Sequence, residues 1–424
     1  MRIELKFERL NTYKTFGQII RYNRTLKGYS LRDLGFLTNI SHTLIANIEN
    51  GKVVANEDTI KDLVKILEIE FYDNQQIIDE FCSLYNEAFN FLYEYEYTKA
   101  TKVMNTVFMK EAIYSNSVVL ADFYVLKYFY LSLTDQIYGD YVKELEALSV
   151  IAKNLTDSQL QMHHFINGIY LYNIGSYLDA HNLLEKALKV GDTKIDPLIR
   201  AYITKCDVKM FKFMNVVTEA NEIIKIFEHD LVYLRAMELR LSIAYCYVLV
   251  KKYDVALEII DKVHRFSTFY NAIYVLEECN IILSAIYLRQ GNIELAKEKI
   301  NRIKRESPYE MFVRTRIAII EKKPKDVEAI YNRFLIYNEL KESKKHQVIF
   351  EIQLYNAKIT NLSDEEYVSK VESLSQLGVR GCDLEIIDVS YTMLINFYKE
   401  KRKYKKALEA SEIARDFRRY GCGQ

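Results

Sequence analysis

The sequence predicts an all-α protein in which a small bundle of short helices precedes a long array of helical hairpins. Only 13 Gly and 3 Pro occur among 424 residues, so few positions force a helix to break. Helix caps follow one another closely in the first seventy residues. Beyond residue 90, a helical pattern recurs with a period of 36 to 40 residues.

The charges of the chain balance. Its 58 basic and 58 acidic residues give a formal net charge of zero, so the chain as a whole is not a polycation that coats nucleic acid. Between residues 14 and 52, however, six Lys or Arg side chains accompany only two Asp or Glu side chains. Any basic surface is therefore local and modest.

Cysteine usage and apolar stretches exclude several classes of protein. The six cysteines lie far apart, with no CxxC pair and no close His partner: Cys82, Cys206, Cys246, Cys279, Cys382 and Cys422. This predicts buried thiols in a reducing cytosol and no metal site. The start, MRIELKFERLN, is charged where a signal peptide is apolar, and the apolar stretch from Val118 is interrupted by Asp122 and Lys127. We expect a cytoplasmic protein without a membrane segment.

No catalytic motif stands out. The sequence lacks a phosphate loop, HExxH, GxSxG and a paired-carboxylate motif. The adjacent His163 and His164 would point roughly 100° apart on a helix, so they cannot both bind one metal from one face. We expect neither catalysis nor a cofactor.

Four short helices are predicted in the first seventy residues from their caps. The first spans about residues 15–27 and ends at Gly28, which reaches the left-handed conformation at low cost. Ser30 caps a very short second helix. Ser41 caps a third helix that ends at Gly51, and a fourth spans about residues 57–67. Two short helices joined by a tight turn form a helix-turn-helix unit.

The third of these helices is the one that can lie in the major groove of DNA. Its apolar residues Leu44, Ile45 and Ile48 form a stripe that faces the bundle. The remaining side chains near its start point outward and are the candidates for reading bases: His42, Thr43, Ala46 and Asn47.

This segment is similar to the phage-repressor (XRE) helix-turn-helix family over about residues 14 to 69. The residues that carry the resemblance are Gly17, Arg24, Gly28, Ser30, Leu34, Ser41, Ile45, Ile48 and the string IENGK. The resemblance implies a structural, partly buried ion pair between Arg24 and Glu49. It also implies that His42, Thr43 and Asn47 contact bases, while Ser41 and backbone amides at helix starts bind phosphate.

Two positions depart from the family pattern. Many members carry glutamine where Leu31 stands, so one contact to the DNA backbone is missing or shifted to Arg32. Gly35 replaces the usual alanine. The candidate DNA-binding residues are Ser30, Arg32, Ser41, His42, Thr43, Asn47 and Lys52. The alternative is a degenerate module that serves only in assembly.

The rest of the chain is divided into a linker and a repeat array. Residues 71–90 contain no Pro, Gly or Ser cluster, so we expect a helical linker between a first domain at 1–70 and a sensor and dimerisation domain at 91–424. A small residue recurs after an aromatic or branched one in the pairs Tyr97/Ala100, Tyr177/Ala180, Val217/Ala220, Tyr253/Ala256, Ile293/Ala296 and Tyr404/Ala407.

The clearest repeat unit resembles a tetratricopeptide repeat. Its residues at the matching spacings are Gly168, Leu171, Gly175, Tyr177, Ala180, Leu184 and Ala187. Fainter units occur near Asp140, Ala329 and Tyr367, so we expect eight or nine hairpins in all. Such hairpins stack into a right-handed superhelix with a concave inner surface that commonly holds extended peptides.

The first helix of each unit is expected to face this inner surface. We expect Tyr202, Lys205, Lys209 and Lys212 to share one helical face, where lysines could hold a peptide carboxylate. Asparagine amides could clamp a peptide backbone. The candidate peptide-binding residues are Tyr172, Asn173, Tyr202, Lys205, Lys209, Lys212, Tyr245, Asn280 and Asn396. Taken singly, each lysine could instead lie on a solvated face and each tyrosine in the core.

An XRE-type domain followed by degenerate tetratricopeptide repeats resembles the RRNPP peptide-pheromone receptors of low-GC Gram-positive bacteria, over essentially the whole chain. The resemblance implies a homodimer that binds a double-stranded DNA operator and an imported short signalling peptide. The peptide would reset the spacing of two DNA-binding heads. Two alternatives remain open: repeats that bind a protein partner, and a scaffold or toxin-antitoxin component in which DNA binding is incidental.

Overall fold

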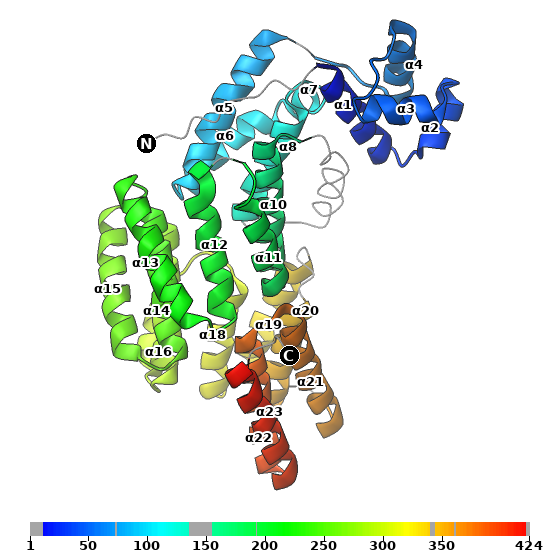
Figure 1. Cartoon of the computed structure of the whole chain (residues 1–424). Helices are drawn as coiled ribbons and strands as arrows, with labels where there is room; N and C mark the ends of the chain where they lie inside the picture. The colour runs from blue at the N-terminus through cyan, green and yellow to red at the C-terminus, as the bar shows by residue number, and fades with distance from the viewer. Residues whose placement is uncertain are drawn as a thin grey trace. The chain divides into compact units, whose positions relative to one another are not determined.

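A computed structural model describes residues 12–72, 74–134, 155–191, 193–339, 344–359 and 362–420 (Figure 1). The chain divides into two compact units, residues 1–169 with 183–199 and residues 170–182 with 200–424. Throughout the described ranges the elements are helices, and β pairing occurs there as an isolated bridge between Tyr72 and Ser117. The all-α prediction is therefore confirmed. The repeat expected near Asp140 lies outside the described residues.

Four short helices form the start of the first unit. They are α1 (Thr12–Leu26), α2 (Leu31–Thr38), α3 (His42–Glu49) and α4 (Glu57–Leu67). The side chain of Ser30 accepts from the amide of Asp33 at 3.1 Å, and the Asp33 carboxylate accepts from the amide of Ser30 at 2.8 Å. Ser41 caps α3 by accepting from the amide of Leu44 at 3.2 Å. Because each cap satisfies an amide that a helix start leaves unpaired, these local bonds fix the helix boundaries.

Two glycines let the short helices approach closely. A Cβ atom on Gly17 of α1 would lie 2.2 Å from the carbonyl oxygen of Ile48 in α3. A Cβ atom on Gly35 of α2 would lie 2.7 Å from the carbonyl oxygen of Ile40. The first contact sets α3 against α1, and the second sets the tight turn before α3.

The remaining helices build the repeat array. They are α5 (Gln75–Tyr93), α6 (Tyr97–Phe108), α7 (Glu111–Tyr114), α8 (Leu120–Leu133), α10 (Asp157–Asn173), α11 (Tyr177–Ala187), the short 3₁₀ helix η2 (Thr193–Ile195), α12 (Asp196–Lys209), α13 (Phe213–His229), α14 (Tyr233–Leu249), α15 (Tyr253–Phe269), α16 (Ile273–Arg289), α17 (Ile293–Ile300), α18 (Pro308–Ile320), α19 (Pro324–Glu339), α20 (Lys344–Asn356), α21 (Asp364–Gly381), α22 (Leu384–Glu400) and α23 (Tyr404–Tyr420). Helix α5 covers most of the residues expected as a linker, and it packs against α6.

Consecutive helices pair as hairpins, and neighbouring hairpins pack side by side from α13 to α18 (Figure 1). The recurring alanines lie in the second helices of hairpins along the chain and are at most 5% exposed: Ala100, Ala180, Ala220, Ala256, Ala296 and Ala407. A small side chain there lets the two helices of a hairpin approach closely. The repeat fold predicted from these alanines is confirmed.

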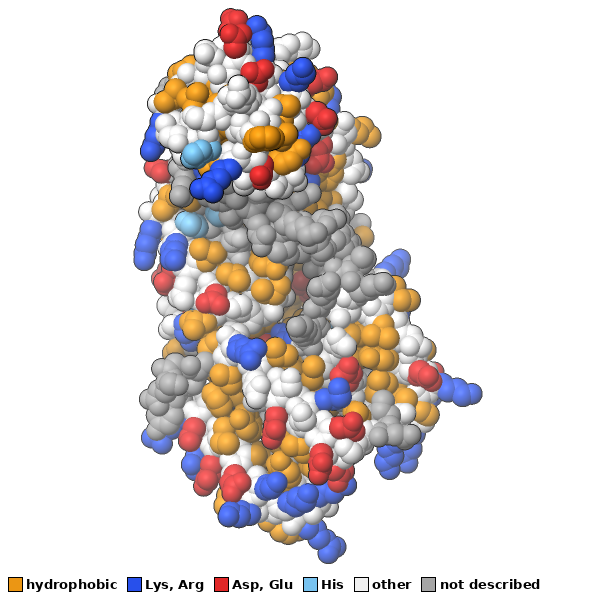
Figure 2. All heavy atoms as spheres, turned by 90° about the vertical axis from the view of Figure 1, so that its right-hand side faces the viewer, with side chains coloured by type: hydrophobic (Ala, Val, Ile, Leu, Met, Phe, Trp, Pro, Cys, Tyr) orange, Lys and Arg blue, Asp and Glu red, His pale blue; other side chains and the backbone are white. Residues whose placement is uncertain are grey.

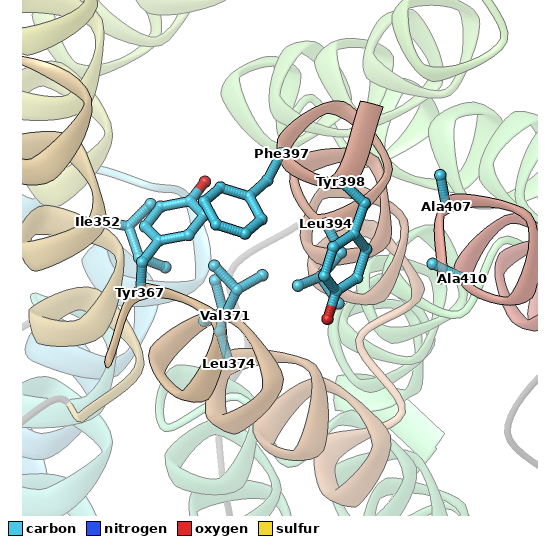
Figure 3. Packing of buried hydrophobic residues seen from close by; sticks show 9 residues of the cluster. All are labelled: Ile352, Tyr367, Val371, Leu374, Leu394, Phe397, Tyr398, Ala407 and Ala410. Carbon is cyan, nitrogen blue, oxygen red and sulfur yellow. The ribbon is translucent and has the colours of Figure 1, made fainter. Parts of the chain in front are cut away.

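The last two hairpins share a hydrophobic core in the second unit (Figure 3). Tyr367 of α21 faces Phe397 of α22, with ring centroids 5.0 Å apart. Val371 and Leu374 lie below these rings, and Ala407 approaches from α23. This core anchors α22. The acidic side chains Asp383 and Glu385 lie at the start of this helix.

The helix-turn-helix segment contacts the first repeats within the first unit. The hydroxyl groups of Tyr22 in α1 and Tyr124 in α8 lie 2.5 Å apart, and their rings pack at 4.7 Å. The Asn23 amide donates to the side-chain oxygen of Asn116 at 3.3 Å. The four-helix bundle, called the head below (residues 12–72), is thus bonded to the helices that follow it.

Candidate nucleic-acid interface and inner surface of the repeats

Helix α3 presents its first turn to solvent. Ser41, His42 and Thr43 are exposed and Asn47 is partly exposed, whereas Ile45 and Ile48 are buried in the head. The other candidates for DNA contact, Ser30, Arg32 and Lys52, are also exposed. An exposed helix start with a buried opposite stripe can enter the major groove and offer short polar side chains to base edges.

The ion pair expected between Arg24 and Glu49 is present and holds α3 to α1. The Arg24 Nε and Nη2 atoms donate to the two Glu49 carboxylate oxygens at 2.6 and 2.9 Å. Arg24 also donates through Nη1 to the carbonyl of Tyr29 at 2.8 Å. Glu49 is only 2% exposed, so this bidentate pair acts inside the head and is not available to DNA.

Basic and acidic side chains are intermixed on the face of the molecule that includes the head. Figure 2 shows Lys and Arg side chains interspersed with Asp and Glu over the coloured part of this face, and neither sign gathers into a broad field. On the face shown, no broad positive field is therefore available to attract DNA.

In the second unit, side chains from several first helices converge on one another. The Nζ atom of Lys205 in α12 lies 2.5 Å from a carboxylate oxygen of Glu238 in α14. The second oxygen of Glu238 accepts from the fully buried Arg235 at 2.9 Å. Lys205 also lies 4.4 Å from the centroid of the Tyr202 ring. Burial alone would lower the pKa of Lys205, but the Glu238 charge raises it, so the lysine stays protonated.

A second cluster joins residues that are far apart in the sequence. The Nζ atom of Lys209 lies 2.9 Å from one oxygen of Glu385, and the hydroxyl of Tyr245 donates to the other oxygen at 2.5 Å. Lys209 also lies 3.4 Å from the hydroxyl of Tyr309. Burial would lower the pKa of Lys209 and raise that of Glu385, yet their mutual attraction moves both pKa values the other way. Both groups are therefore charged.

Two tyrosines expected at the inner surface lie beside these cations. The rings of Tyr172 and Tyr202 pack edge to face at 6.1 Å. Burial raises the pKa of the Tyr172 hydroxyl, so it stays a neutral hydrogen-bonding group. Five of the nine candidate peptide-binding residues thus lie close to one another: Tyr172, Tyr202, Lys205, Lys209 and Tyr245.

The expected continuous row of three lysines is wrong. Helix α12 ends at Lys209, and Phe211 in the turn adopts a positive φ of 56°. Lys212 therefore lies at the start of α13, where its Nζ atom is 3.1 Å from Asp207. The helical spacing continued past the point where the chain turns, so the sequence pattern could not reveal this break.

The three candidate asparagines lie in different surroundings. Asn280 of α16 is 5% exposed and donates to the carbonyl of Leu276 at 2.9 Å. Its buried side-chain oxygen has no hydrogen-bond partner among the described residues. Asn173 and Asn396 are exposed. Among the three, Asn280 combines burial with an acceptor that a ligand amide could satisfy.

Sequence reasoning missed the partners of the candidate lysines: Glu238, Arg235, Tyr309 and Glu385. Lys209 and Glu385 are 176 residues apart, so no local pattern relates them. The one available signal was the pair of acids in CDLEII at the start of α22, where Asp383 and Glu385 flank Leu384. Acids are common in the first turn of a helix, and the pattern alone does not indicate a distant partner.

Neither a metal site nor a membrane span is found in the described part of the chain. No group of three or more His, Cys, Asp or Glu side chains there could hold a metal ion. Nor is any helix within the described ranges long and apolar enough to cross a bilayer.

These features define a class of protein: a helix-turn-helix DNA-binding domain followed by a superhelical array of helical hairpins. Residues 20–73 match the helix-turn-helix family HTH_3. No curated protein sequence resembles the chain significantly.

Solved structures resemble most of the chain. A Rap protein in complex with competence and sporulation factor is 12% identical, with a TM-score of 0.64 over 80% of this chain and 98% of that one. NprR in complex with its cognate peptide NprX is 14% identical, with a TM-score of 0.57 over 82% of this chain and 100% of that one. The apo form of NprR from B. thuringiensis is 13% identical, with a TM-score of 0.50 over 80% and 99% of the two chains. At these identities the likeness shows the fold, and it confirms the predicted helical-repeat superhelix after the helix-turn-helix segment.

Proposed function

We propose that the protein is a cytoplasmic transcriptional regulator that binds operator DNA through its head and a short signalling peptide through the inner surface of its repeats. One observation carries the proposal: the exposed start of α3 belongs to the same chain as a repeat array whose fold is similar to that of NprR in complex with its cognate peptide. The cluster around Lys205, Lys209 and Tyr245, with the unpaired oxygen of Asn280, offers charged and amide-binding groups to a peptide.

The protein is proposed to act as a homodimer. Two heads must match half-sites about one helical turn, or about 34 Å, apart or a multiple of that distance. A stack of hairpins changes its curvature through small rotations between neighbouring repeats. A peptide that prefers one curvature would therefore shift the population of head spacings and with it the affinity for the operator.

DNA binding is tested with the promoter region of the protein's own gene. We expect fluorescence anisotropy to show binding that weakens steeply with salt, because phosphate contacts release counterions. Asn47→Ala should weaken specific binding roughly tenfold or more. Lys52→Ala should reduce the salt slope, whereas the matched change Lys61→Ala on α4 should not. Salt-independent or absent binding would favour the scaffold or assembly alternatives.

Peptide binding is tested by thermal shift with short peptides encoded beside the gene. We expect one of them to stabilise the protein, because a ligand that binds only the folded state raises the melting temperature. The triple variant Lys205→Ala, Lys209→Ala, Lys212→Ala should lose this stabilisation. Stabilisation that is unchanged in the triple variant would remove these residues from the site but keep the function.

A protein partner is the second candidate, and an exposed aromatic patch favours it. Phe269, the last residue of α15, is 83% exposed, and Tyr270, which follows it, is 56% exposed. Leu231, before α14, and Tyr233, the first residue of α14, are also exposed, and the ring of Tyr233 lies 6.0 Å from that of Phe266. The absence of any stabilising peptide, with no peptide-coding frame beside the gene, would favour this candidate.

A further inference from the structure

The first turn of α22 carries two acidic side chains that are held by cations from other repeats. The Nζ atom of Lys209 lies 2.9 Å from Glu385, and the Nζ atom of Lys345 lies 3.1 Å from Asp383. Lys345 also lies 3.3 Å from the hydroxyl of Tyr177 in α11. These contacts join the start of α22 to α11, α12 and α20.

Glu385 sits in a receptor that suits a carboxylate. One of its oxygens faces the ammonium group of Lys209, and the other accepts from the hydroxyl of Tyr245. The hydroxyl of Tyr309 lies on the other side of Lys209, at 3.4 Å. The three receptor residues come from α12, α14 and α18, and the carboxylate alone comes from α22. We call Lys209, Tyr245 and Tyr309 the carboxylate receptor.

Of the three residues of the carboxylate receptor, Tyr309 is the most exposed to solvent. Tyr309 is 45% exposed, although the side chains of Lys209 and Glu385 are only 10% and 18% exposed. Removal of Glu385 without replacement would leave a buried ammonium group unpaired, which is costly. Replacement of Glu385 by a second carboxylate keeps the same charges and hydrogen bonds. Exchange of one carboxylate for another is therefore the low-cost way to open this contact.

We propose that the peptide is recognised by a carboxylate group that displaces Glu385 from the carboxylate receptor. This inference rests on the proposed peptide-binding function and specifies its chemistry and its regulation. Glu385 acts as an internal competitor that occupies the receptor in the absence of peptide. Once it is displaced, the start of α22 loses its ion pair with Lys209 and keeps the ion pair between Asp383 and Lys345. The start of α22 is then held less tightly, while the hydrophobic core with α20 and α21 still anchors the rest of the helix.

The test compares three synthetic pools of random heptapeptides. The first has a free carboxyl terminus and no Asp or Glu, the second is amidated and contains Asp and Glu, and the third is amidated without Asp or Glu. Retention of each pool is measured by mass spectrometry on wild-type protein, Glu385→Gln, and the exposed control Glu412→Gln on α23. The first two pools distinguish a terminal carboxylate from a side-chain carboxylate.

We expect Glu385→Gln to retain one of the carboxylate-bearing pools about tenfold better than wild type, because the internal competitor has lost its charge while Lys209 remains. The neutral amidated pool should not gain, and Glu412→Gln should behave as wild type. The double variant Lys209→Met with Glu385→Gln should lose the gain. The charge-swapped variant Lys209→Glu with Glu385→Lys should have a melting temperature close to that of wild type. This result would show that an ion pair still forms with the two charges exchanged and that the fold is intact.

The outcomes separate this inference from the proposed function. If a pool binds wild type and Glu385→Gln equally, or if the neutral pool gains as much as the acidic ones, the inference is overturned while peptide binding stands. If no pool binds wild type or any variant, peptide binding itself is overturned, and the inference with it.

Discussion

The head and the inner surface of the second unit both depend on polar side-chain contacts, but the two partners of a contact lie at different distances along the chain. In the head, Ser30 bonds to Asp33 and Arg24 bonds to Glu49 only 25 residues away. At the inner surface, Lys209 and Glu385 are separated by 176 residues. Local sequence patterns therefore determine the structure of the head. The contacts at the inner surface depend instead on how the repeats between the two partners pack.

The largest expected effect is in the head, at the close approach of α1 and α3. Gly17→Ala would place a Cβ atom 2.2 Å from the carbonyl oxygen of Ile48. Because this oxygen belongs to the backbone of a helix, it cannot move away without a large loss of stability. We expect a loss of about 3 kcal/mol or more, enough to unfold the head and abolish DNA binding. Hydrogen exchange of residues 12–72 measures it. Gly28→Ala is the matched control, because its φ of 72° is strained but the space beside it is open, so it should cost only about 1 kcal/mol.

The second unit has an equivalent close approach that links distant repeats. A Cβ atom on Gly381, at the end of α21, would lie 2.0 Å from the carbonyl oxygen of Gly175. We expect Gly381→Ala to cost about 2 to 3 kcal/mol and to leave the head folded. Urea unfolding followed by exchange in the second unit measures this loss. Gly291→Ala, with open space around it, should cost about 1 kcal/mol, and an equal loss from both changes would refute the packing argument.

A loss of similar size is expected from the buried ion pair of the head. Glu49→Gln leaves Arg24 without its carboxylate while keeping the shape of the side chain. We expect a loss of about 2 to 3 kcal/mol in the free energy of unfolding of the head. The exposed pair of Lys27 and Glu68 provides the comparison, since Glu68 is 80% exposed and Glu68→Gln should change stability by only a few tenths of a kcal/mol. Urea titrations of both variants decide between a structural and a superficial role.

The same contrast explains what the sequence could predict. The helix at 57–67 was predicted with its observed bounds, because Asn56 caps it by accepting from the amide of Thr59 and its apolar stripe is continuous. The repeat alanines were found because each repeat uses the same local packing rule. The start of α3 was located from Ser41 alone, which caps it in the structure.

The inner surface could be predicted only in part. The expected cluster of Tyr172, Tyr202 and Lys205 forms because the first helices of neighbouring repeats present these side chains to the same side. Lys212 lies outside the expected row because the helix ends at Lys209. The turn that follows contains Phe211 at a positive φ, and no glycine or proline marks this turn in the sequence. Glu385 could not be assigned, because its partners depend on the curvature accumulated over several repeats.

The smallest expected effect, and the one that depends on pH, lies in the first repeats at Asp122 of α8. Its carboxylate accepts from the Gln159 side chain at 3.0 Å, and burial raises its pKa to about 6. Since an unfolded Asp titrates near pH 3.9, the folded state binds this proton more tightly, and the protein loses stability as the pH rises from about 4 to about 6. Asp122→Asn removes the charge and keeps a group that can bond to Gln159. We expect it to be more stable than wild type by about 1 to 2 kcal/mol at pH 7.5 and equal to it near pH 4.

Urea unfolding at the two pH values measures this difference, with the exposed change Asp261→Asn as control. Asp261 is 65% exposed and pairs with Arg265 at 2.8 Å, so its removal should shift stability by a few tenths of a kcal/mol at either pH. If Asp122→Asn and wild type differ by the same amount at both pH values, the carboxylate does not titrate in the folded state near pH 6. Any stability difference between the two proteins would then come from packing and not from the charge of the buried carboxylate. In that case the first repeats would resemble the head, where the buried Glu49 is paired with Arg24.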